Sequence, residues 1–243
     1  MDSTKKTAYD FNEQASEKYR SVDELVIHQD PFLHYRNIIQ DISSSFNYKI
    51  TVLDLGCGTG RYFHCLKNVE KLVGIDTSSH MLEKARNPVN KDIMEIEKIE
   101  LLCGDIFDIQ TPAHSFDFVF SIGVFGEFSP INSDLCNKLY DLLKPYGILF
   151  ITTVDVHSRI QYFDKRNPYW QKLLLRKSFC FLPKKLKKYV NKKLGAFYVT
   201  KKESEDIFKA SAFSKIEISL YEHPKGLGWQ GAHFDCIAIK GSP

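Results

Sequence analysis

The stretch from Val52 to Arg61 constrains the fold of this chain more than any other. It reads VLDLGCGTGR, an apolar run that contains the carboxylate of Asp54 and leads into a glycine-rich loop. Such a run is typical of a strand buried on both faces of a parallel sheet. The loop allows a tight turn and close approach of a ligand to the backbone, and we expect a helix to begin near Arg61. The three glycines of the loop are Gly56, Gly58 and Gly60.

The spacing of these glycines distinguishes two kinds of nucleotide-like ligand. In the dinucleotide-binding fingerprint the third glycine stands five positions after the first, where a helix starts and holds a pyrophosphate. Arg61 occupies that position here. The Gly-x-Gly-x-Gly turn preceded by Asp54 instead resembles motif I of the class I S-adenosylmethionine-dependent methyltransferases. The resemblance implies that the loop packs on the methionine moiety of the cofactor and that Asp54 helps to position its ammonium group.

A second segment that resembles this family lies at residues 71–77. It is a short apolar strand that ends in Asp76, twenty residues after Gly56. Open α/β sheets bind ligands at the carboxyl ends of their strands. The resemblance implies that Asp76 accepts hydrogen bonds from both ribose hydroxyls, and that Thr77 and Met81 line the same site. The alternative role for an aspartate that ends a strand is the N-cap of the next helix.

Two further segments match in the family's order. Residues 99–106 resemble the strand that ends beside the adenine, which implies that Asp105 meets the adenine amino group and that Ile106 packs on the ring. Residues 116–123 resemble motif IV, whose last residues line the place where methyl donor and acceptor meet. The residues at those positions are Ser121 and Ile122. Four matches in sequence make isolated capping roles a poor explanation.

The order of the remaining elements defines the fold class. Residues 139–151 are typical of a helix, a Pro/Gly turn and a fifth strand. A sixth helix is predicted over residues 198–213, capped by Thr200 and Glu203. Two terminal strands follow, over residues 215–222 and 233–240. We expect an α/β fold with a three-layer, doubly wound, mostly parallel seven-stranded sheet, an antiparallel last strand, N-terminal helices and a helical cap insertion.

Two helical segments precede the predicted core, at about residues 7–20 and 31–44. The second has apolar side chains at helical spacing. In the family that the core resembles, aromatic and basic side chains of the N-terminal segment often close over the cofactor. The candidates here are Tyr9, Tyr19 and Arg20. Ordinary packing is the alternative for both tyrosines. We expect residues 1–48 to form lid helices.

The insertion at residues 155–194 separates the two parts of the predicted cofactor-binding core, 49–154 and 195–243. Between Arg159 and Lys193 it carries twelve Lys or Arg residues and one acidic residue, a net charge of +11, whereas the whole chain carries +3. Leucines and aromatic residues lie among these charges, as in basic amphipathic helices. Four roles stay open: a solvated cap over the active site, contact with an anionic membrane surface, recognition of an anionic small substrate, and contact with nucleic acid, for which no RNA-binding module is visible.

Methyl transfer from a sulfonium needs few catalytic side chains, because the cofactor carries the activation. An acceptor of high pKa would profit from a general base, and the loops after the fourth and fifth strands place Glu127, Asp155 and His157 near the methyl group. We take Glu127 and His157 as the candidate catalytic residues; local hydrogen bonding is the alternative for His157. Relatives often have Glu-His where this chain has Glu127-Phe128, so that histidine role is not transferred. No metal is predicted.

These observations predict an S-adenosylmethionine-dependent methyltransferase that acts at O or N of a small organic acceptor. The alternatives are a methyltransferase of a lipid-like, quinone or glycoconjugate substrate at a membrane surface, and a non-catalytic S-adenosylmethionine-binding protein. The N-terminus lacks the apolar core of a leader, and no apolar run approaches the ~20 residues that span a bilayer. We therefore expect a cytoplasmic monomer or homodimer, peripheral to a membrane if residues 159–193 bind one, with nucleic acid disfavoured as a partner.

Overall fold

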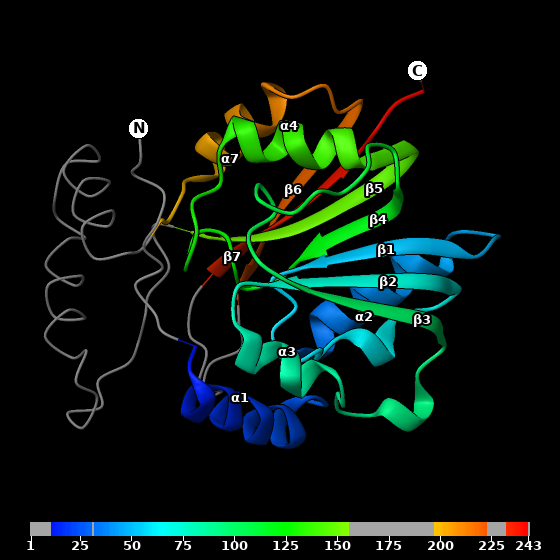
Figure 1. The fold of residues 1–243 in the computed structure, drawn as a ribbon. Helices are drawn as coiled ribbons and strands as arrows, with labels where there is room; N and C mark the ends of the chain where they lie inside the picture. The colour runs from blue at the N-terminus through cyan, green and yellow to red at the C-terminus, as the bar shows by residue number, and fades with distance from the viewer. Residues whose placement is uncertain (1–10, 31, 156–196, 223–231, 243) are drawn as a thin grey trace, which may run out of the picture.

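A computed structural model describes residues 11–30, 32–155, 197–222 and 232–242 (Figure 1). Seven strands form one sheet in the order β3-β2-β1-β4-β5-β7-β6. Strands β1 to β5 pair in parallel, and β7 runs antiparallel to both of its neighbours. The strands are β1 (Ile50–Leu55), β2 (Val69–Asp76), β3 (Ile96–Cys103), β4 (Phe116–Ser121), β5 (Leu143–Val154), β6 (Lys215–Glu222) and β7 (Ala232–Ile239). The doubly wound, mostly parallel sheet with an antiparallel last strand is confirmed.

Helices cover both faces of this sheet and make three layers (Figure 1). On one face lie α4 and α7; on the other lie α2 and α3, with α1 beside α3. The α-helices are α1 (Glu13–Val26), α2 (Phe32–Ser44), α3 (Ser79–Ala85), α4 (Ser133–Leu142) and α7 (Lys201–Lys209), and the short 3₁₀ turns are η1 (Phe63–Cys65) and η2 (Lys91–Ile93). Among the described residues, no helix is both long and apolar enough to span a bilayer.

The core divides into two apolar clusters because the central strands alternate between the two faces. Leu53 and Val119 face α4 and α7, whereas Val52 and Phe118 face α2. All four side chains are fully buried. A strand that is buried on both faces has an apolar sequence throughout, which explains why β1 could be predicted from its residues alone.

The prediction that a helix begins near Arg61 is wrong. The chain makes only the 3₁₀ turn η1 there and reaches β2 after Asn68, which has a left-handed backbone with φ +58°. The residues from Tyr62 to Leu66 are all buried. An amphipathic helix has a solvent-facing side, so five consecutive buried residues favour a short turn inside the core.

The other predicted helices differ from the structure mainly at their ends. The first described helix, α1, begins after Asn12, whose side chain caps it by accepting from the N–H of Ala15 at 3.0 Å. It continues to Val26, beyond the predicted end at residue 20. The sixth, α7, is shorter than predicted, but Thr200 and Glu203 form the expected capping box. Both terminal strands lie within one residue of their predicted bounds.

Several predictions concern residues outside the described ranges. They include Tyr9, His157 and nearly all of the basic insertion, 155–194. The division into lid, core and cap therefore stays a prediction. Of the predicted lid helices, α2 packs on the sheet itself, with Phe32, Tyr35 and Ile39 buried in the core.

Candidate functional site

The candidate site lies at the carboxyl ends of β1 and β4, where the strand order reverses and open α/β sheets form a crevice for ligands. The loop after β1 begins with Gly56, whose N–H donates to the carbonyl of Ile75 in β2 at 2.7 Å. The φ of Gly56 is +75°, and a Cβ atom there would lie 2.3 Å from Cγ2 of Val124. Only glycine fits this position, so the loop is held between β2 and the segment after β4.

Gly58 stands on the open side of the same loop. Its φ is +54°, and a Cβ atom at this position would meet no heavy atom within 4 Å. The N–H of Gly58 donates to Oδ2 of Asp76 at 2.9 Å, so the end of β2 holds the loop. This arrangement leaves room for a ligand directly against the backbone, next to a carboxylate.

Asp76 faces the glycine loop from the end of β2 and is half-buried. Burial raises the pKa of its carboxyl group, whereas hydrogen bonds from backbone N–H groups lower it. Its Oδ1 accepts from the N–H of Ser78 at 2.8 Å. The N-cap of α3 is Ser78, whose hydroxyl accepts from the N–H of Met81, so capping is not the role of Asp76. Thr77 is exposed at the same edge, and Met81 is buried below it.

Asp54 is the second carboxylate beside the loop, and only 3% of its surface is exposed. Burial raises the pKa of its carboxyl group well above the usual value, and the charge of Asp76 raises it further. Within the described ranges, no donor hydrogen-bonds to the Asp54 carboxylate. A cation placed beside these two acids would relieve their repulsion, so the ammonium group expected at this position fits their chemistry.

The other predicted cofactor residues reach the same edge of the sheet. Asp105 is exposed, and its Oδ1 accepts from the backbone N–H two residues on, which leaves the second oxygen for other donors. Ile106 is buried beside it. The hydroxyl of Ser121 donates to the carbonyl of Leu55 at 2.6 Å and thereby ties the ends of β4 and β1 together. Ile122 is half-buried. The ligand contacts of all four residues stay predictions.

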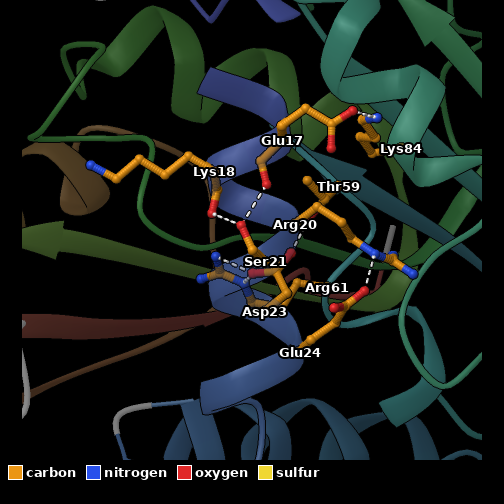
Figure 2. Close-up of polar contacts among 9 residues, drawn as sticks. All are labelled: Glu17, Lys18, Arg20, Ser21, Asp23, Glu24, Thr59, Arg61 and Lys84. Carbon is orange, nitrogen blue, oxygen red and sulfur yellow. Dashed lines mark hydrogen bonds and ion pairs between the residues drawn. The ribbon is translucent and has the colours of Figure 1, made fainter. Parts of the chain in front are cut away.

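The N-terminal helix contacts the glycine loop through a residue that sequence analysis missed. Asp23 of α1 is completely buried and accepts hydrogen bonds from Thr59 and Arg61 (Figure 2). Tyr19 is half-buried, and the guanidinium of Arg61 lies 6.0 Å from its ring centroid. Arg20 pairs with Glu24 one turn further along the helix, at 3.2 Å. Asp23 is separated from Thr59 and Arg61 by 36 and 38 positions in the sequence, so no local sequence pattern indicates this contact.

On the acceptor side, Glu127 is half-buried in the loop after β4. Burial is the main cause that raises the pKa of the Tyr35 hydroxyl in α2; of the charges that raise it further, Asp235 contributes most and Glu127 least. Nε2 of His34 lies 2.7 Å from Oδ2 of Asp235. Sequence spacing does not indicate this pair, because 201 residues separate its members.

Two further polar residues lie at this edge. Asp155 is buried, and its N–H donates to the carbonyl of Ala232. His233 pairs with Val154 across β7 and β5. Within the described part of the chain, no three His, Cys, Asp or Glu side chains come together as a group that could hold a metal ion.

Comparisons with known proteins identify a family and several relatives. A family described as "Methyltransferase domain" matches residues 47–210. The chain is 32% identical to a malonyl-[acyl-carrier protein] O-methyltransferase of Priestia megaterium over 149 residues, which cover 59% of this chain and 49% of that protein. It is 24% identical to a demethylmenaquinone methyltransferase of Oceanobacillus iheyensis over 84% of this chain and 85% of that one.

A solved structure with a similar fold is phosphoethanolamine N-methyltransferase 2 of Haemonchus contortus, in complex with phosphomonomethylethanolamine and S-adenosylhomocysteine. The TM-score is 0.66 at 16% identity, and the match covers 96% of this chain and 58% of that one. This chain thus spans only about half the length of the first curated relative and somewhat more of this structure.

Proposed function

This chain belongs to the methyltransferase-domain family, and we propose that it transfers a methyl group from S-adenosylmethionine to O or N of a small organic acceptor. The observation that carries the proposal is the open backbone at Gly58, hydrogen-bonded to the half-buried carboxylate of Asp76 at the point where the strand order reverses. When bound, the cofactor supplies an activated methyl group. The protein then needs mainly to hold and align the two reactants.

Each cofactor group has a matching residue in the proposed site. Asp76 retains acceptor capacity for ribose hydroxyls, since a carboxylate offers about four lone-pair positions. Asp54 provides a buried carboxyl group, and the ammonium of the methionine moiety would favour its ionised form. Asp105 and Ile106 serve the adenine, one through its free oxygen and the other through its apolar side chain. Thr77, Met81, Ser121, Ile122 and Tyr19 complete the proposed lining.

The acceptor is proposed to bind beside the ends of β4 and β5. Support comes from the polar side chains gathered there, and from relatives whose names include small or carrier-bound acceptors. We keep Glu127 and His157 as the candidate groups that take a proton from the acceptor. Glu127 is supported by its half-buried position in the loop after β4.

A second candidate is a methyltransferase that acts on a lipid-like or quinone substrate at a membrane surface. It is supported by the net charge of +11 in residues 159–193 and by the named substrate of the demethylmenaquinone methyltransferase. Each basic residue near an anionic bilayer contributes about 1 kcal/mol of attraction. Sedimentation with phosphatidylserine and phosphatidylcholine vesicles tests this candidate: salt-sensitive binding to the anionic vesicles alone is expected, and equal recovery with both would reject it.

The acceptor itself is best sought by direct transfer. The protein is incubated with radiolabelled S-adenosylmethionine and separate fractions of host metabolites, lipids and RNA, with Asp76→Asn as the binding-deficient comparison. We expect label in a small-molecule fraction with the wild type and much less with the variant. Label in no fraction, despite measurable cofactor binding, would favour the non-catalytic alternative; label in RNA alone would contradict the proposed acceptor class.

A further inference from the structure

Three hydrogen-bond and ion-pair contacts join helix α1 to the loop that follows β1. All three converge on the carboxylate of Asp23, which accepts from the hydroxyl of Thr59 and pairs with the guanidinium of Arg61 through two of its nitrogens (Figure 2). Thr59 and Arg61 flank Gly60 in the glycine loop. A residue 36 positions earlier in the chain is therefore bound to the loop that is proposed to receive the cofactor.

The burial of this carboxylate makes the fold depend on its partners. Asp23 has no exposed surface, and only 13% of the Arg61 side chain is exposed. Removing a carboxylate from water costs several kcal/mol, and only paired, hydrogen-bonded geometry compensates for that cost. Asp23 therefore gains its partners only when α1 and the loop are both in place, so that each stabilises the other.

Arg61 extends this contact to a third element. Its guanidinium lies 4.4 Å from the ring centroid of Phe32 in α2, which is buried in the core. A cation over the face of an aromatic ring is attracted by the ring quadrupole. The Arg61 side chain thus contacts both the sheet-packed helix α2 and Asp23 of α1.

The loop is held at its other side by the sheet. Asp76 accepts from the N–H of Gly58, next to Thr59, so two carboxylates from different elements bind adjacent residues of the loop. Asp76 is the residue proposed to meet the ribose. The affinity for a cofactor that contacts Gly58 and Asp76 would therefore depend on whether Asp23 is bound to Thr59 and Arg61.

The other contacts of α1 are weaker and supply a control. Glu17 pairs with Lys84 of α3, but 60% of the Glu17 side chain is exposed (Figure 2). Exposed ion pairs contribute little to stability, because water screens them and both side chains lose freedom. This pair also holds α1 on its neighbour, yet it does not reach the glycine loop.

We propose that Asp23 is a positioning residue: by binding Thr59 and Arg61 it holds the glycine loop in the conformation that receives the cofactor, so that α1 docking and cofactor binding strengthen each other. The inference rests on the proposed function, because it takes the loop as the cofactor site. Reciprocity follows from thermodynamic linkage: if α1 docking favours binding by a given factor, binding favours docking by the same factor.

The test measures two quantities on the full chain, wild type and Asp23→Asn, with Glu17→Gln as the matched control. Hydrogen exchange of the peptides that cover residues 13–26 and 56–61 is followed with and without S-adenosylhomocysteine, and affinity for S-adenosylhomocysteine is measured by calorimetry. For Asp23→Asn we expect exchange of both segments to accelerate at least tenfold and affinity to fall at least tenfold. Glu17→Gln should change each by less than about threefold.

Several outcomes would overturn the proposal. One is faster exchange in α1 of Asp23→Asn while loop exchange and affinity stay at wild-type values, because Asp23 would then anchor only its own helix. Another is an equal effect of Glu17→Gln. If the wild type fails to bind S-adenosylhomocysteine, the proposed function fails. The exchange of residues 56–61 without ligand would still show whether Asp23 stabilises the loop.

A second variant keeps the test decisive if Asp23→Asn does not fold. Thr59→Val removes one donor to Asp23 and leaves the ion pair with Arg61. We expect changes in the same direction, of about threefold to tenfold, in the exchange of both segments and in affinity. Unchanged exchange of residues 13–26 in Thr59→Val would show that the loop does not stabilise α1 and would contradict the reciprocity.

Discussion

At the scale of single residues, two glycines of the same loop meet different requirements, one of the fold and one of ligand binding. The sequence motif does not distinguish them. Gly56 is needed by the fold, because a side chain there would collide with Val124. Gly58 has no such neighbour, although its backbone is left-handed. The space beside Gly58 is instead available to a ligand, which assigns the two glycines to stability and to binding respectively.

Substitution of each glycine by alanine tests this assignment. Gly58→Ala should lower the free energy of unfolding by only about 1 kcal/mol, the usual cost of a left-handed alanine, yet weaken S-adenosylhomocysteine binding at least tenfold. Gly56→Ala should reduce stability by several times that amount, as seen in urea unfolding. Full affinity in Gly58→Ala would mean that the ligand does not approach this backbone.

His64 makes the stability of the fold depend on pH. Burial, followed by the charges of Arg36 and His28, lowers the pKa of its imidazole from 6.5 to about 4. Between these two values the unfolded chain binds the proton and the native protein does not, so stability is complete above pH 6.5 and falls as pH decreases toward 4. The loss from this one group is at most about 3 kcal/mol.

The pH dependence of unfolding checks this expectation. Urea unfolding of the wild type and His64→Gln at pH 7.5, 6.0 and 5.0 should give free energies that decrease more steeply with acid in the wild type. The carboxylates that titrate in the same pH range affect both proteins, so the difference between wild type and His64→Gln isolates the contribution of His64. Parallel curves for the two proteins would show that His64 is not held neutral by the fold.

At the scale of elements, local patterns predicted what depends on local contacts. The buried strand β1, the capping box at Thr200 and the carboxylate at the end of β2 each follow from residues close together in sequence. The helix expected after the glycine loop does not form, since η1 lies inside the core. The contact of Asp23 with Thr59 and the pair of His34 with Asp235 join distant segments, and no local pattern encodes them.

The opposite edge of the sheet has its own polar anchor. Asp117 in β4 is buried and accepts from the N–H of Thr51 at 2.8 Å, the hydroxyl of Tyr48 at 3.2 Å and Nζ of Lys144 at 2.7 Å. It ties the starts of β1 and β4 to β5. It lies at the amino ends of the strands, away from the candidate site.

Replacement of Asp117 should therefore lower the free energy of unfolding without changing the affinity for the cofactor. Asp117→Ala leaves the Thr51 N–H without its acceptor and should lower the free energy of unfolding by roughly 2–3 kcal/mol. Asp117→Asn, which keeps an acceptor oxygen, should lose less. Calorimetry below the unfolding temperature should give wild-type affinity for S-adenosylhomocysteine in both variants, and a large loss of affinity would show that the two edges are coupled.

At the scale of the whole molecule, charge is unevenly distributed. Residues 159–193 carry +11 and the remainder of the chain −8, although the total is only +3. The carboxylates of Asp54, Asp76 and Asp105 gather at one edge of the sheet because parallel strands end there together. Composition predicted the charge separation, whereas only the sheet order shows that the three acids share an edge.

The central claim is that S-adenosylmethionine binds at this edge, against the glycine loop and Asp76. Calorimetric titration of S-adenosylhomocysteine into the wild type, Asp76→Ala and Asp92→Ala tests it most directly, since Asp92 is an exposed carboxylate in η2 that is not among the residues proposed to hold the cofactor. We expect one site in the wild type, an affinity about thirtyfold or more weaker in Asp76→Ala, and no change in Asp92→Ala. Equal affinities in all three proteins, or no binding to the wild type, would contradict the account.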